Sequence, residues 1–318
     1  MPLIDLPLDE LEQYQGRNPR PTDFDGFWAR ALAELDATPE DAELQPASFV
    51  SRVADAFDLT FGGVAGARVY AKLLVPKGAS AAPAALMFHG YSGNSGDWAD
   101  KLSLVSEGFV VAALDVRGQA GRSTDPAGHT GTTFYGHIAR GAADSPDKLL
   151  YRHIYLDCVR LARLVGALPE VDSTRVCSVG GSQGGGLALA CAALEPSIAR
   201  VASLYPFLCD WLRVWELDLA VSAYDGLRQH LRCFDPLHER KDEFFTTMGY
   251  IDVQHLAPRI RGEVLMVIGL MDDICPPSTQ FAAYNKITAP KQRIIYPDYG
   301  HESYPGWNDI AFGFLREV

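Results

Sequence analysis

The chain has 318 residues and a mass of 34.7 kDa, which fits one large domain or two small ones at roughly 100–200 residues per domain. Hydrophobic residues make up 47% and charged residues 21%, and this balance excludes a disordered, collagen-like or coiled-coil chain. Lys and Arg total 28 against 40 for Asp and Glu, a net charge of −12, so we expect neither nucleic acid nor an anionic membrane surface as a partner.

Helical periodicity opens the chain. Apolar residues recur at helical spacing over residues 8–15 and again over 23–35, and Thr22 or Asp23 after Pro21 is the expected N-cap of the second helix. Further on, short apolar runs rich in β-branched residues and bounded by Gly, Pro or Asp predict strands. The predicted strands are Val69–Val75, Ala84–Phe88, Phe109–Asp115, Val176–Val179, Val201–Tyr205, Val264–Gly269 and Arg293–Tyr296.

Helical stretches separate several of these strands, notably residues 149–168, 185–194 and 279–287. Strands that alternate with helices and are apolar over most of their length predict a mostly parallel sheet that is covered on both faces. The expected fold class is therefore α/β. Because no linker, repeat or change of composition divides the chain, we expect a single domain over residues 1–318.

Residues 207–259 depart from this alternation, because they are mostly helical and rich in aromatic side chains. We interpret them as a helical insertion that covers one end of the sheet. Two interpretations of its aromatic residues Trp211, Trp215 and Tyr224 remain open. Either they shape a substrate pocket or an oligomer interface, or they are ordinary core residues.

The start of the chain, Met1 to Asp5, lacks the basic region and apolar core of a secretory signal. No apolar run approaches the roughly 18 residues that a membrane span requires. The cysteines do not show Cys-x-x-Cys spacing, and we expect them to be reduced core residues. The six are Cys158, Cys177, Cys191, Cys209, Cys233 and Cys275. The expected location is therefore the cytoplasm.

The most informative segment is Gly180-Gly181-Ser182-Gln183-Gly184, between the strand that ends at Val179 and the helix that begins near Gly185. A Gly-x-Ser-x-Gly sequence in this position is typical of a nucleophile elbow. In such an elbow the serine occupies a strained turn, and the flanking glycines allow the strand and helix to approach closely. We therefore predict that Ser182 is a nucleophile at the carboxyl edge of the sheet.

A serine hydroxyl needs a general base, because it is almost wholly protonated at neutral pH. Two late segments follow predicted strands at the same edge of the sheet, Asp272-Asp273 and His301. The chain order Ser, Asp, His is typical of an α/β-hydrolase triad, so His301 is the predicted base and an aspartate orients it. The residues alone do not distinguish Asp272 from Asp273.

The loop His89-Gly90-Tyr91 follows the predicted strand that ends at Phe88. It is similar to the His-Gly loops that supply an oxyanion N–H in lipases and esterases. Together with the residue after the nucleophile, it predicts Tyr91 and Gln183 as the backbone oxyanion donors. We interpret His89 itself as a structural neighbour and Trp98, shortly after the loop, as a residue that lines the acyl pocket.

Motifs for other chemistries are missing from the sequence. It contains no H-E-x-x-H pair, no Gly-Lys dipeptide for a Walker A loop and no G-x-G-x-x-G that opens a helix after an early strand. We therefore expect neither a metal nor another cofactor. The chemistry that remains is metal-free acyl transfer.

The chain resembles the acetyl xylan esterase and cephalosporin C deacetylase family, carbohydrate esterase family 7, whose members carry R-G-Q, G-x-S-Q-G and H-E signatures. Here these are Arg117-Gly118-Gln119, the elbow around Ser182, and His301-Glu302. The resemblance implies an α/β-hydrolase fold and a triad of Ser182, Asp272 and His301, with Tyr91 and Gln183 as oxyanion donors. It also implies structural roles for Arg117, Gly118, Gln119 and Glu302, a cytoplasmic location, and a homohexamer whose active sites face an internal cavity.

The expected function is that of a serine esterase that removes acetyl groups from small O-acetylated substrates, such as acetylated xylo-oligosaccharides or cephalosporin C, through an acetyl-enzyme. One alternative is a peptidase of the prolyl oligopeptidase type, whose elbow and triad order are alike, although 318 residues leave little room for the large gating domain of such enzymes. The other is a catalytically silent hydrolase-fold protein that only binds a ligand.

Overall fold

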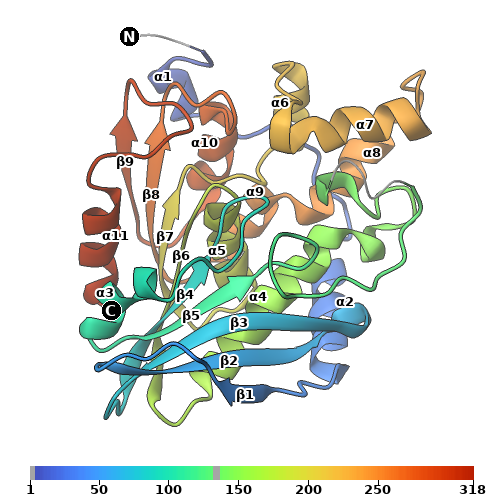
Figure 1. Cartoon of the computed structure of the whole chain (residues 1–318). Helices are drawn as coiled ribbons and strands as arrows, with labels where there is room; N and C mark the ends of the chain where they lie inside the picture. Colours follow the sequence, from blue (N-terminus) through green and yellow to red (C-terminus); the bar gives the residue numbers. More distant parts are fainter. Residues whose placement is uncertain (1–3, 132–136) are drawn as a thin grey trace.

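A nine-stranded sheet, in the order β1-β2-β3-β5-β4-β6-β7-β8-β9, runs through the molecule (Figure 1). The computed structural model describes residues 4–131 and 137–318; residues 1–3, part of the segment inspected for a secretory signal, lie outside it. The strands are β1 (Glu43–Pro46), β2 (Ala54–Gly63), β3 (Ala67–Pro76), β4 (Ala82–Phe88), β5 (Val110–Asp115), β6 (Val171–Gly181), β7 (Ile198–Leu204), β8 (Glu263–Gly269) and β9 (Lys291–Tyr296).

The sheet changes from antiparallel to parallel pairing at β5. The first three strands pair antiparallel with their neighbours, and β3 pairs antiparallel with β5, whereas all pairings from β5 through β9 are parallel. Every residue of β5 is buried, as expected of a central strand that is covered on both faces. The predicted α/β class with a mostly parallel sheet is confirmed, and all seven predicted strands are present.

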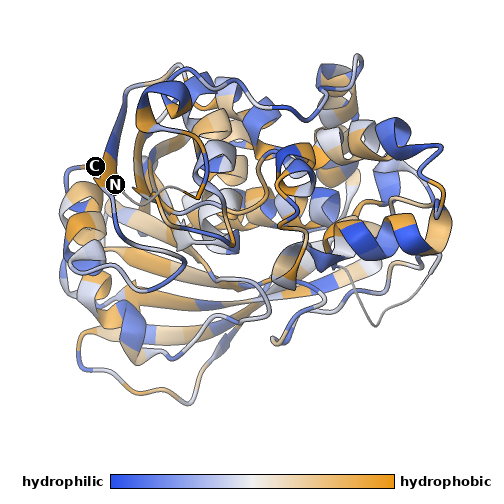
Figure 2. Ribbon diagram, turned by 90° about the horizontal axis from the view of Figure 1, so that it is seen from above, coloured by the Kyte–Doolittle hydropathy of each residue, from blue (hydrophilic) through white to orange (hydrophobic). Residues whose placement is uncertain are grey.

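Helices cover both faces of the sheet (Figure 1). One face packs on the core that contains α2, α4, α5 and α10, and the other packs on α3 and α11. Seen from above in Figure 2, the strands are mostly orange, while the outer faces of the helices are blue. The helices are α1 (Leu8–Leu11), α2 (Phe24–Ala37), α3 (Leu102–Ser106), α4 (Leu150–Gly166), α5 (Gln183–Leu194), α6 (Trp211–Glu216), α7 (Asp225–Phe234), α8 (Lys241–Met248), α9 (Val253–Leu256), α10 (Pro277–Lys286) and α11 (Trp307–Arg316).

Two sequence predictions need correction, and a third, the N-cap of the second helix, is confirmed in its position but not by a capping hydrogen bond. The first helix is only four residues long, Leu8–Leu11, and not the eight from 8 to 15. Asp23 occupies the N-cap position of α2, but among the described residues its side chain accepts from Tyr250 and Arg30 instead of from a helix N–H. All six cysteines are free thiols, yet Cys233 is exposed, because it lies on the outer face of the amphipathic helix α7.

The helical insertion between β7 and β8 contains α6 to α9, and its helices α6, α7 and α8 lie at the upper right of Figure 1. Trp211 and Tyr224 are fully buried in it, and the Tyr224 ring lies 4.4 Å from that of Phe207. Trp215 is half-buried and packs on Phe245. The core interpretation is therefore confirmed for Trp211 and Tyr224. Over the described residues, no helix combines the length and apolar character needed to cross a membrane.

A buried carboxylate, Asp210, attaches the N-terminal segment to this insertion, and a second one, Asp252, holds Asp210 in place. Asp210 accepts hydrogen bonds from the Tyr14 hydroxyl (2.8 Å) and from the backbone N–H of Arg17 (3.0 Å) and Asn18 (2.8 Å). Its own N–H donates to the Asp252 carboxylate over 3.0 Å. Burial and the neighbouring Asp252 raise the pKa of Asp210, and burial raises the pKa of Asp252 from 3.8 to about 6.

This pair predicts a pH-dependent stability. Because the folded chain raises the pKa of both acids, their ionisation destabilises the fold, and the contribution of this pair to the free energy of unfolding falls as the pH rises from about 4 through 6. In Asp252→Asn we therefore expect the free energy of unfolding at pH 7.5, minus that at pH 4.5, to be about 2 kcal/mol more positive than in wild type. Urea unfolding at the two pH values measures this difference. The exposed Asp55→Asn is the control and should keep the wild-type difference; an unchanged difference in Asp252→Asn would contradict the prediction.

Candidate active site

Ser182 lies on a sharp turn between β6 and α5. Its φ of 56° and ψ of −121° are rare for a residue with a side chain and store strain that the surrounding structure has to hold. The Ser182 N–H donates to Leu204 O over 2.9 Å, and its carbonyl accepts from the N–H of Gly186 at 3.1 Å and of Phe207 at 3.0 Å. The turn is therefore fixed from both sides, and it presents the hydroxyl at the carboxyl edge of the sheet.

The two outer glycines of the elbow are required by close packing. A Cβ on Gly184 would lie 2.0 Å from Phe88 O, and one on Gly180 would lie 2.6 Å from the same oxygen and 2.4 Å from the backbone of Gly184. Side chains do not fit at such distances. The predicted reason for the Gly-x-Ser-x-Gly spacing, close approach of strand and helix, is therefore confirmed.

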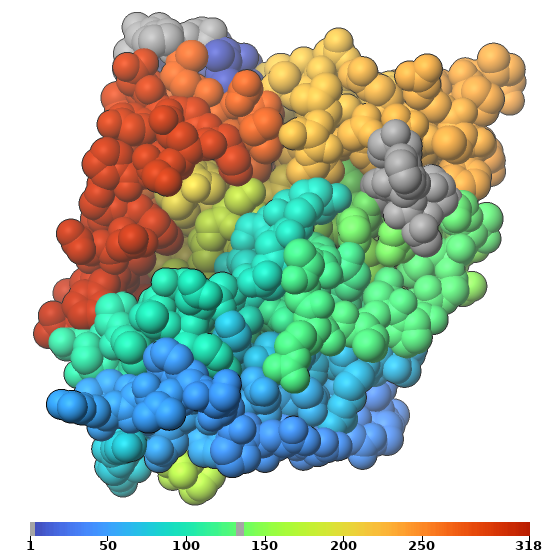
Figure 3. Space-filling view, viewed as in Figure 1, coloured from blue at the N-terminus to red at the C-terminus, as the bar shows by residue number. Residues whose placement is uncertain are grey.

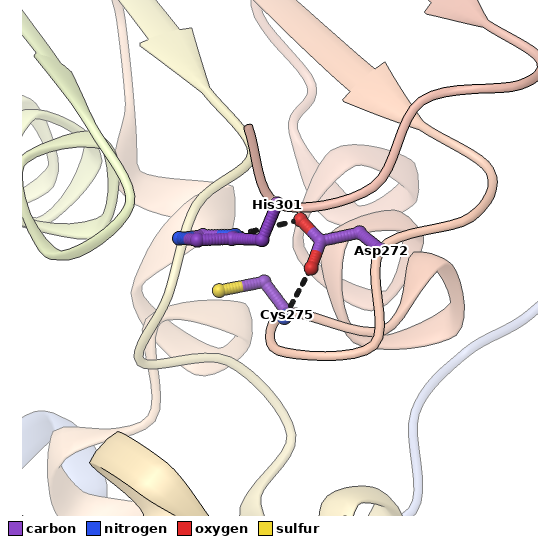
Figure 4. A group of neighbouring side chains, drawn as sticks. All are labelled: Asp272, Cys275 and His301. Carbon is purple, nitrogen blue, oxygen red and sulfur yellow. Dashed lines mark hydrogen bonds and ion pairs between the residues drawn. The ribbon is translucent and has the colours of Figure 1, made fainter. Parts of the chain in front are cut away.

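His301 comes from the loop after β9 and reaches the serine. Its Nε2 lies 3.0 Å from Ser182 Oγ, and its Nδ1 lies 2.9 Å from Asp272 Oδ2. Figure 4 shows the imidazole and the Asp272 carboxylate meeting edge to edge. Three segments that are distant in the sequence therefore bring a hydroxyl, an imidazole and a carboxylate into one hydrogen-bonded row, in the order expected for proton transfer away from the hydroxyl.

The two adjacent aspartates have different environments. Asp272 is fully buried, whereas Asp273 is exposed. Asp272 Oδ1 accepts from the N–H groups of Ile274 (2.9 Å) and Cys275 (2.7 Å), which leaves Oδ2 for His301. The turn that follows the aspartate therefore aims its carboxylate, and of the two residues it is Asp272 that contacts the histidine.

Aromatic side chains pack on one side of the His301 imidazole. The Tyr205 ring centroid lies 4.4 Å from that of His301, and Tyr205 in turn packs on Tyr304 at 5.1 Å. Burial, with the nearby Asp272 charge, raises the pKa of Tyr205 to about 12, so the phenol is neutral. The His301 side chain stays 20% exposed. The imidazole is therefore held between a buried carboxylate and an apolar ring, with one side open to a ligand.

Gln183 begins α5, where backbone N–H groups lack intrahelical acceptors, and its side chain is completely buried. The side-chain oxygen accepts from Tyr151 OH and from Gln119 Nε2, both over 2.7 Å. The side-chain nitrogen donates to Gln119 Oε1 at 3.1 Å and to His89 O at 3.3 Å. These bonds join the elbow to the loop after β4, where Tyr91 lies.

The Arg117-Gly118-Gln119 segment supports this junction. Gln119 Oε1 also accepts from the N–H of Ser92, at 2.9 Å. Arg117 is fully buried and binds Asp157 of α4 through two 2.6 Å hydrogen bonds. Burial raises the pKa of Asp157, and the guanidinium opposes that effect. Gly118, with a φ of 72°, turns the chain between the two anchors.

The other predicted residues lie around this centre. His89 accepts from Val116 N–H at its Nε2 (3.0 Å) and contacts Gly90 O through Nδ1 (2.7 Å), and burial lowers its pKa. Tyr91 packs against Phe207. Glu302 is exposed and accepts from Gly300 N–H at 3.1 Å.

Trp98 stacks on Phe49, 5.8 Å away, with Lys72 over its ring. It lines a depression that also holds Tyr70, Asp115 and Arg122. Its assignment to the acyl pocket stays a prediction.

A cleft lies beside the elbow. It has a volume of about 640 Å³ and is lined by Gly180, Gly181, Ser103, Trp307 and Phe312, among others. Figure 3 shows the surface hollowed between the C-terminal segment (red) and the teal segment that follows β4. The sequence did not indicate the part played by α11 in this wall, because that helix was not predicted.

Sequence reasoning also missed three residues of the centre: Tyr151, Tyr205 and Cys275. Tyr151 is in a predicted helix and Tyr205 ends a predicted strand. The spacing of apolar residues predicts these elements, but it does not predict which distant side chains the two tyrosines contact. The sequence indicated more strongly that Cys275 belongs to the centre, since it follows Asp272 within a short loop. Its buried thiol lies next to the imidazole (Figure 4).

Comparison with known proteins gives consistent matches. The family model described as acetyl xylan esterase (AXE1) matches residues 1–318. The acetyl esterase Axe7A of Xylanibacter ruminicola is 30% identical over 289 residues, which cover 88% of this chain and 63% of that protein. The chain thus spans less than two thirds of the length of this curated relative.

Two solved structures are similar over nearly their whole length. Acetyl xylan esterase 1 from Thermoanaerobacterium sp. JW/SL YS485 has a TM-score of 0.97 at 54% identity, covering 98% of this chain and 99% of that one. The acetyl xylan esterase from Paenibacillus sp. R4 has a TM-score of 0.93 at 35% identity, covering 98% and 100%.

Proposed function

Because the chain belongs to the acetyl xylan esterase family, as its sequence signatures indicated, we propose that it is a serine esterase that removes acetyl groups from small O-acetylated substrates. The substrate classes that we propose are acetylated xylo-oligosaccharides and the acetoxymethyl group of cephalosporin C. The single observation that carries the proposal is the continuous row from Ser182 Oγ through His301 to Asp272, with separations of 3.0 and 2.9 Å.

The proposed reaction has two halves. Ser182 Oγ attacks the acetyl carbonyl carbon while His301 Nε2 takes the hydroxyl proton and then gives it to the departing alcohol. This leaves an acetyl group on the serine. A water molecule, deprotonated by the same nitrogen, then attacks the acetyl-enzyme; as the bond to Ser182 Oγ breaks and acetate leaves, Nε2 returns the proton to Oγ. Asp272 holds Nδ1–H toward itself, keeps Nε2 as the acceptor and stabilises the imidazolium.

The negative charge on the carbonyl oxygen needs fixed donors, and we propose the backbone N–H groups of Tyr91 and Gln183. Such donors must point at the oxygen as its charge develops, so a small displacement of either N–H weakens its hydrogen bond to the oxyanion and raises the activation free energy. Gln119 supports the proposal, because it binds the side chain of one donor residue, Gln183, and the N–H of Ser92, which follows the other donor residue, Tyr91. It is a positioning residue.

Replacing Gln119 tests this role. We expect Gln119→Ala to lower kcat for p-nitrophenyl acetate by about 10- to 100-fold with little change in KM, somewhat less than the loss of an oxyanion donor itself. Gln292→Ala, which changes an exposed glutamine of β9, is the matched control and should retain wild-type kcat. A Gln119→Ala enzyme with unchanged kcat, or one changed in KM alone, would remove Gln119 from the positioning of the donors.

The substrate class is tested by a panel of esters. We expect p-nitrophenyl acetate and propionate to be turned over readily and kcat/KM to fall by at least about tenfold at butyrate, continuing to octanoate, since one methylene in a restrictive pocket is worth roughly 10- to 200-fold. Cephalosporin C should lose its acetyl group. Comparable turnover of octanoate would refute the small-acyl assignment. Preferential cleavage of a peptide amide would favour the peptidase alternative, and a folded but inactive protein would favour the silent one.

We also propose a homohexamer and a cytoplasmic location. Both rest on the family resemblance, and the solution mass measured by light scattering tests the first: six copies of the 34.7 kDa chain are expected.

A further inference from the structure

Cys275 is a side chain of the centre that the proposed reaction does not use. It is fully buried, and burial raises the pKa of its thiol. In Figure 4 its sulfur lies alongside the His301 ring, and a dashed line joins the Asp272 carboxylate to Nδ1 of that ring. One ligand atom from each of the three side chains, a sulfur, a nitrogen and an oxygen, lies within 4.8 Å of the other two.

The local chain fixes this arrangement. Asp272 and Cys275 share one tight turn, because the aspartate Oδ1 accepts from the Cys275 N–H at 2.7 Å. The turn runs directly into α10, which begins at Pro277. His301 approaches from a separate loop and is held by its 2.9 Å contact with Asp272 Oδ2. The three donors are therefore held in place by the folded chain and need little rearrangement to meet a common ligand.

Their chemistry selects the ligand. Thiolate and imidazole are the preferred donors for soft and borderline cations, and a carboxylate oxygen completes a common zinc ligand set. We propose that Asp272, Cys275 and His301 form an inhibitory site for a thiophilic divalent cation, such as Zn²⁺ or Cd²⁺. The inhibitory effect rests on the proposed function of this site, whereas the binding itself does not.

Charge and proton balance support the proposal. The Cys275 thiol loses its proton to solvent on binding, and the thiolate and the Asp272 carboxylate together neutralise the two positive charges. A cation on either ring nitrogen of His301 removes the base of the serine. On Nε2 it occupies the lone pair that would accept the Ser182 proton, and on Nδ1 it moves the ring proton to Nε2, which then donates to Ser182 Oγ.

The geometry requires only a modest closure. Metal bonds of about 2.0–2.3 Å in a tetrahedral site put the ligand atoms about 3.3–3.8 Å apart, so atoms that lie up to 4.8 Å apart close by about 1 Å. The fourth position can take water from the exposed side of His301, which is 20% accessible. Mg²⁺ prefers six oxygen ligands and should not bind here.

Binding is measured on the Ser182→Ala protein, which retains all three ligands. Cadmium chloride is titrated while the thiolate-to-cadmium absorption in the ultraviolet and the heat of binding are followed. We expect one equivalent of Cd²⁺ to produce the band. The band should disappear in Ser182→Ala/Cys275→Ala and in Ser182→Ala/Cys275→Ser, and it should persist in Ser182→Ala/Cys233→Ala, which lacks the exposed thiol.

Inhibition is measured separately on proteins that keep Ser182. Hydrolysis of p-nitrophenyl acetate is followed with increasing Cd²⁺, and each rate is divided by the rate of the same variant without metal. We expect the inhibitory concentration to rise by about 10-fold or more in Cys275→Ala and to stay at the wild-type value in Cys233→Ala, and we expect Mg²⁺ not to inhibit.

The possible outcomes separate the two proposals. A cadmium band that survives the loss of Cys275, or that is lost with Cys233, overturns the metal site. Equal inhibition of wild type and Cys275→Ala also overturns it. If Ser182→Ala still hydrolyses acetate esters, the proposed function fails, but the binding titration still decides whether the cation site exists.

Discussion

Replacing Ser182 by alanine is expected to lower kcat for p-nitrophenyl acetate by about 10⁴-fold or more, because it removes the hydroxyl that forms the acyl-enzyme in the proposed reaction and leaves the proposed oxyanion donors and substrate binding. The melting temperature should stay close to that of the wild type. The backbone bonds that fix the turn, from Ser182 N–H to Leu204 O and from Gly186 N–H to Ser182 O, do not involve the hydroxyl. Steady-state kinetics with a thermal melt measure both effects.

The matched control is Ser173→Ala, an exposed serine near the start of the same strand, β6. It should keep the wild-type kcat and melting temperature. A Ser182→Ala protein that retains more than a few per cent of the activity, in a preparation free of contaminating esterase, would show that another residue attacks the ester.

Asp272→Asn is expected to lower kcat by about 10³- to 10⁴-fold. The amide oxygen can still accept from the N–H groups of Ile274 and Cys275, so the turn is retained. The amide NH₂ then faces His301 Nδ1 and requires that nitrogen to be the acceptor. The ring proton therefore lies on Nε2, and the imidazole has the wrong tautomer to take the proton of Ser182.

The adjacent residue provides the control for this substitution. Asp273→Asn makes the same chemical change one position later, on an exposed side chain, and should leave kcat within about twofold of wild type, as for most surface substitutions away from special features. If Asp273→Asn lost activity and Asp272→Asn did not, the orienting role of Asp272 would be wrong.

The elbow and the late histidine were readable from the sequence because both are local patterns set against predicted strands. Ser182 has glycines at fixed offsets, and those glycines are needed for close packing against Phe88. The local sequence could not predict whether Asp272 or Asp273 orients the histidine, since that depends on which of the two carboxylates accepts hydrogen bonds from the turn that follows. The family resemblance selected Asp272, and the structure shows that residue in contact with His301.

The two outermost antiparallel strands, β1 and β2, were missed for a different reason. In β2, charged and polar residues alternate with apolar ones, and the strand is only partly buried, so it has no continuous apolar run. A continuous apolar run is typical of strands covered on both faces, so β2 carries no such signal in the sequence. The contacts of Tyr151 with Gln183 and of Arg117 with Asp157 join residues 32 and 40 positions apart, and no local pattern encodes them.

The ion pair between Arg117 and Asp157 restricts how this protein can vary. Both side chains are fully buried. Replacing either one alone therefore leaves the other charge buried without a partner, which lowers the free energy of unfolding by about 3–5 kcal/mol. Replacing both by apolar groups of the same volume can be nearly neutral. Substitutions at the two positions are therefore coupled, and each is tolerated only with a matching change at the other. In a mutant library selected for function, survivors changed at one of them should carry a compensating change at the other.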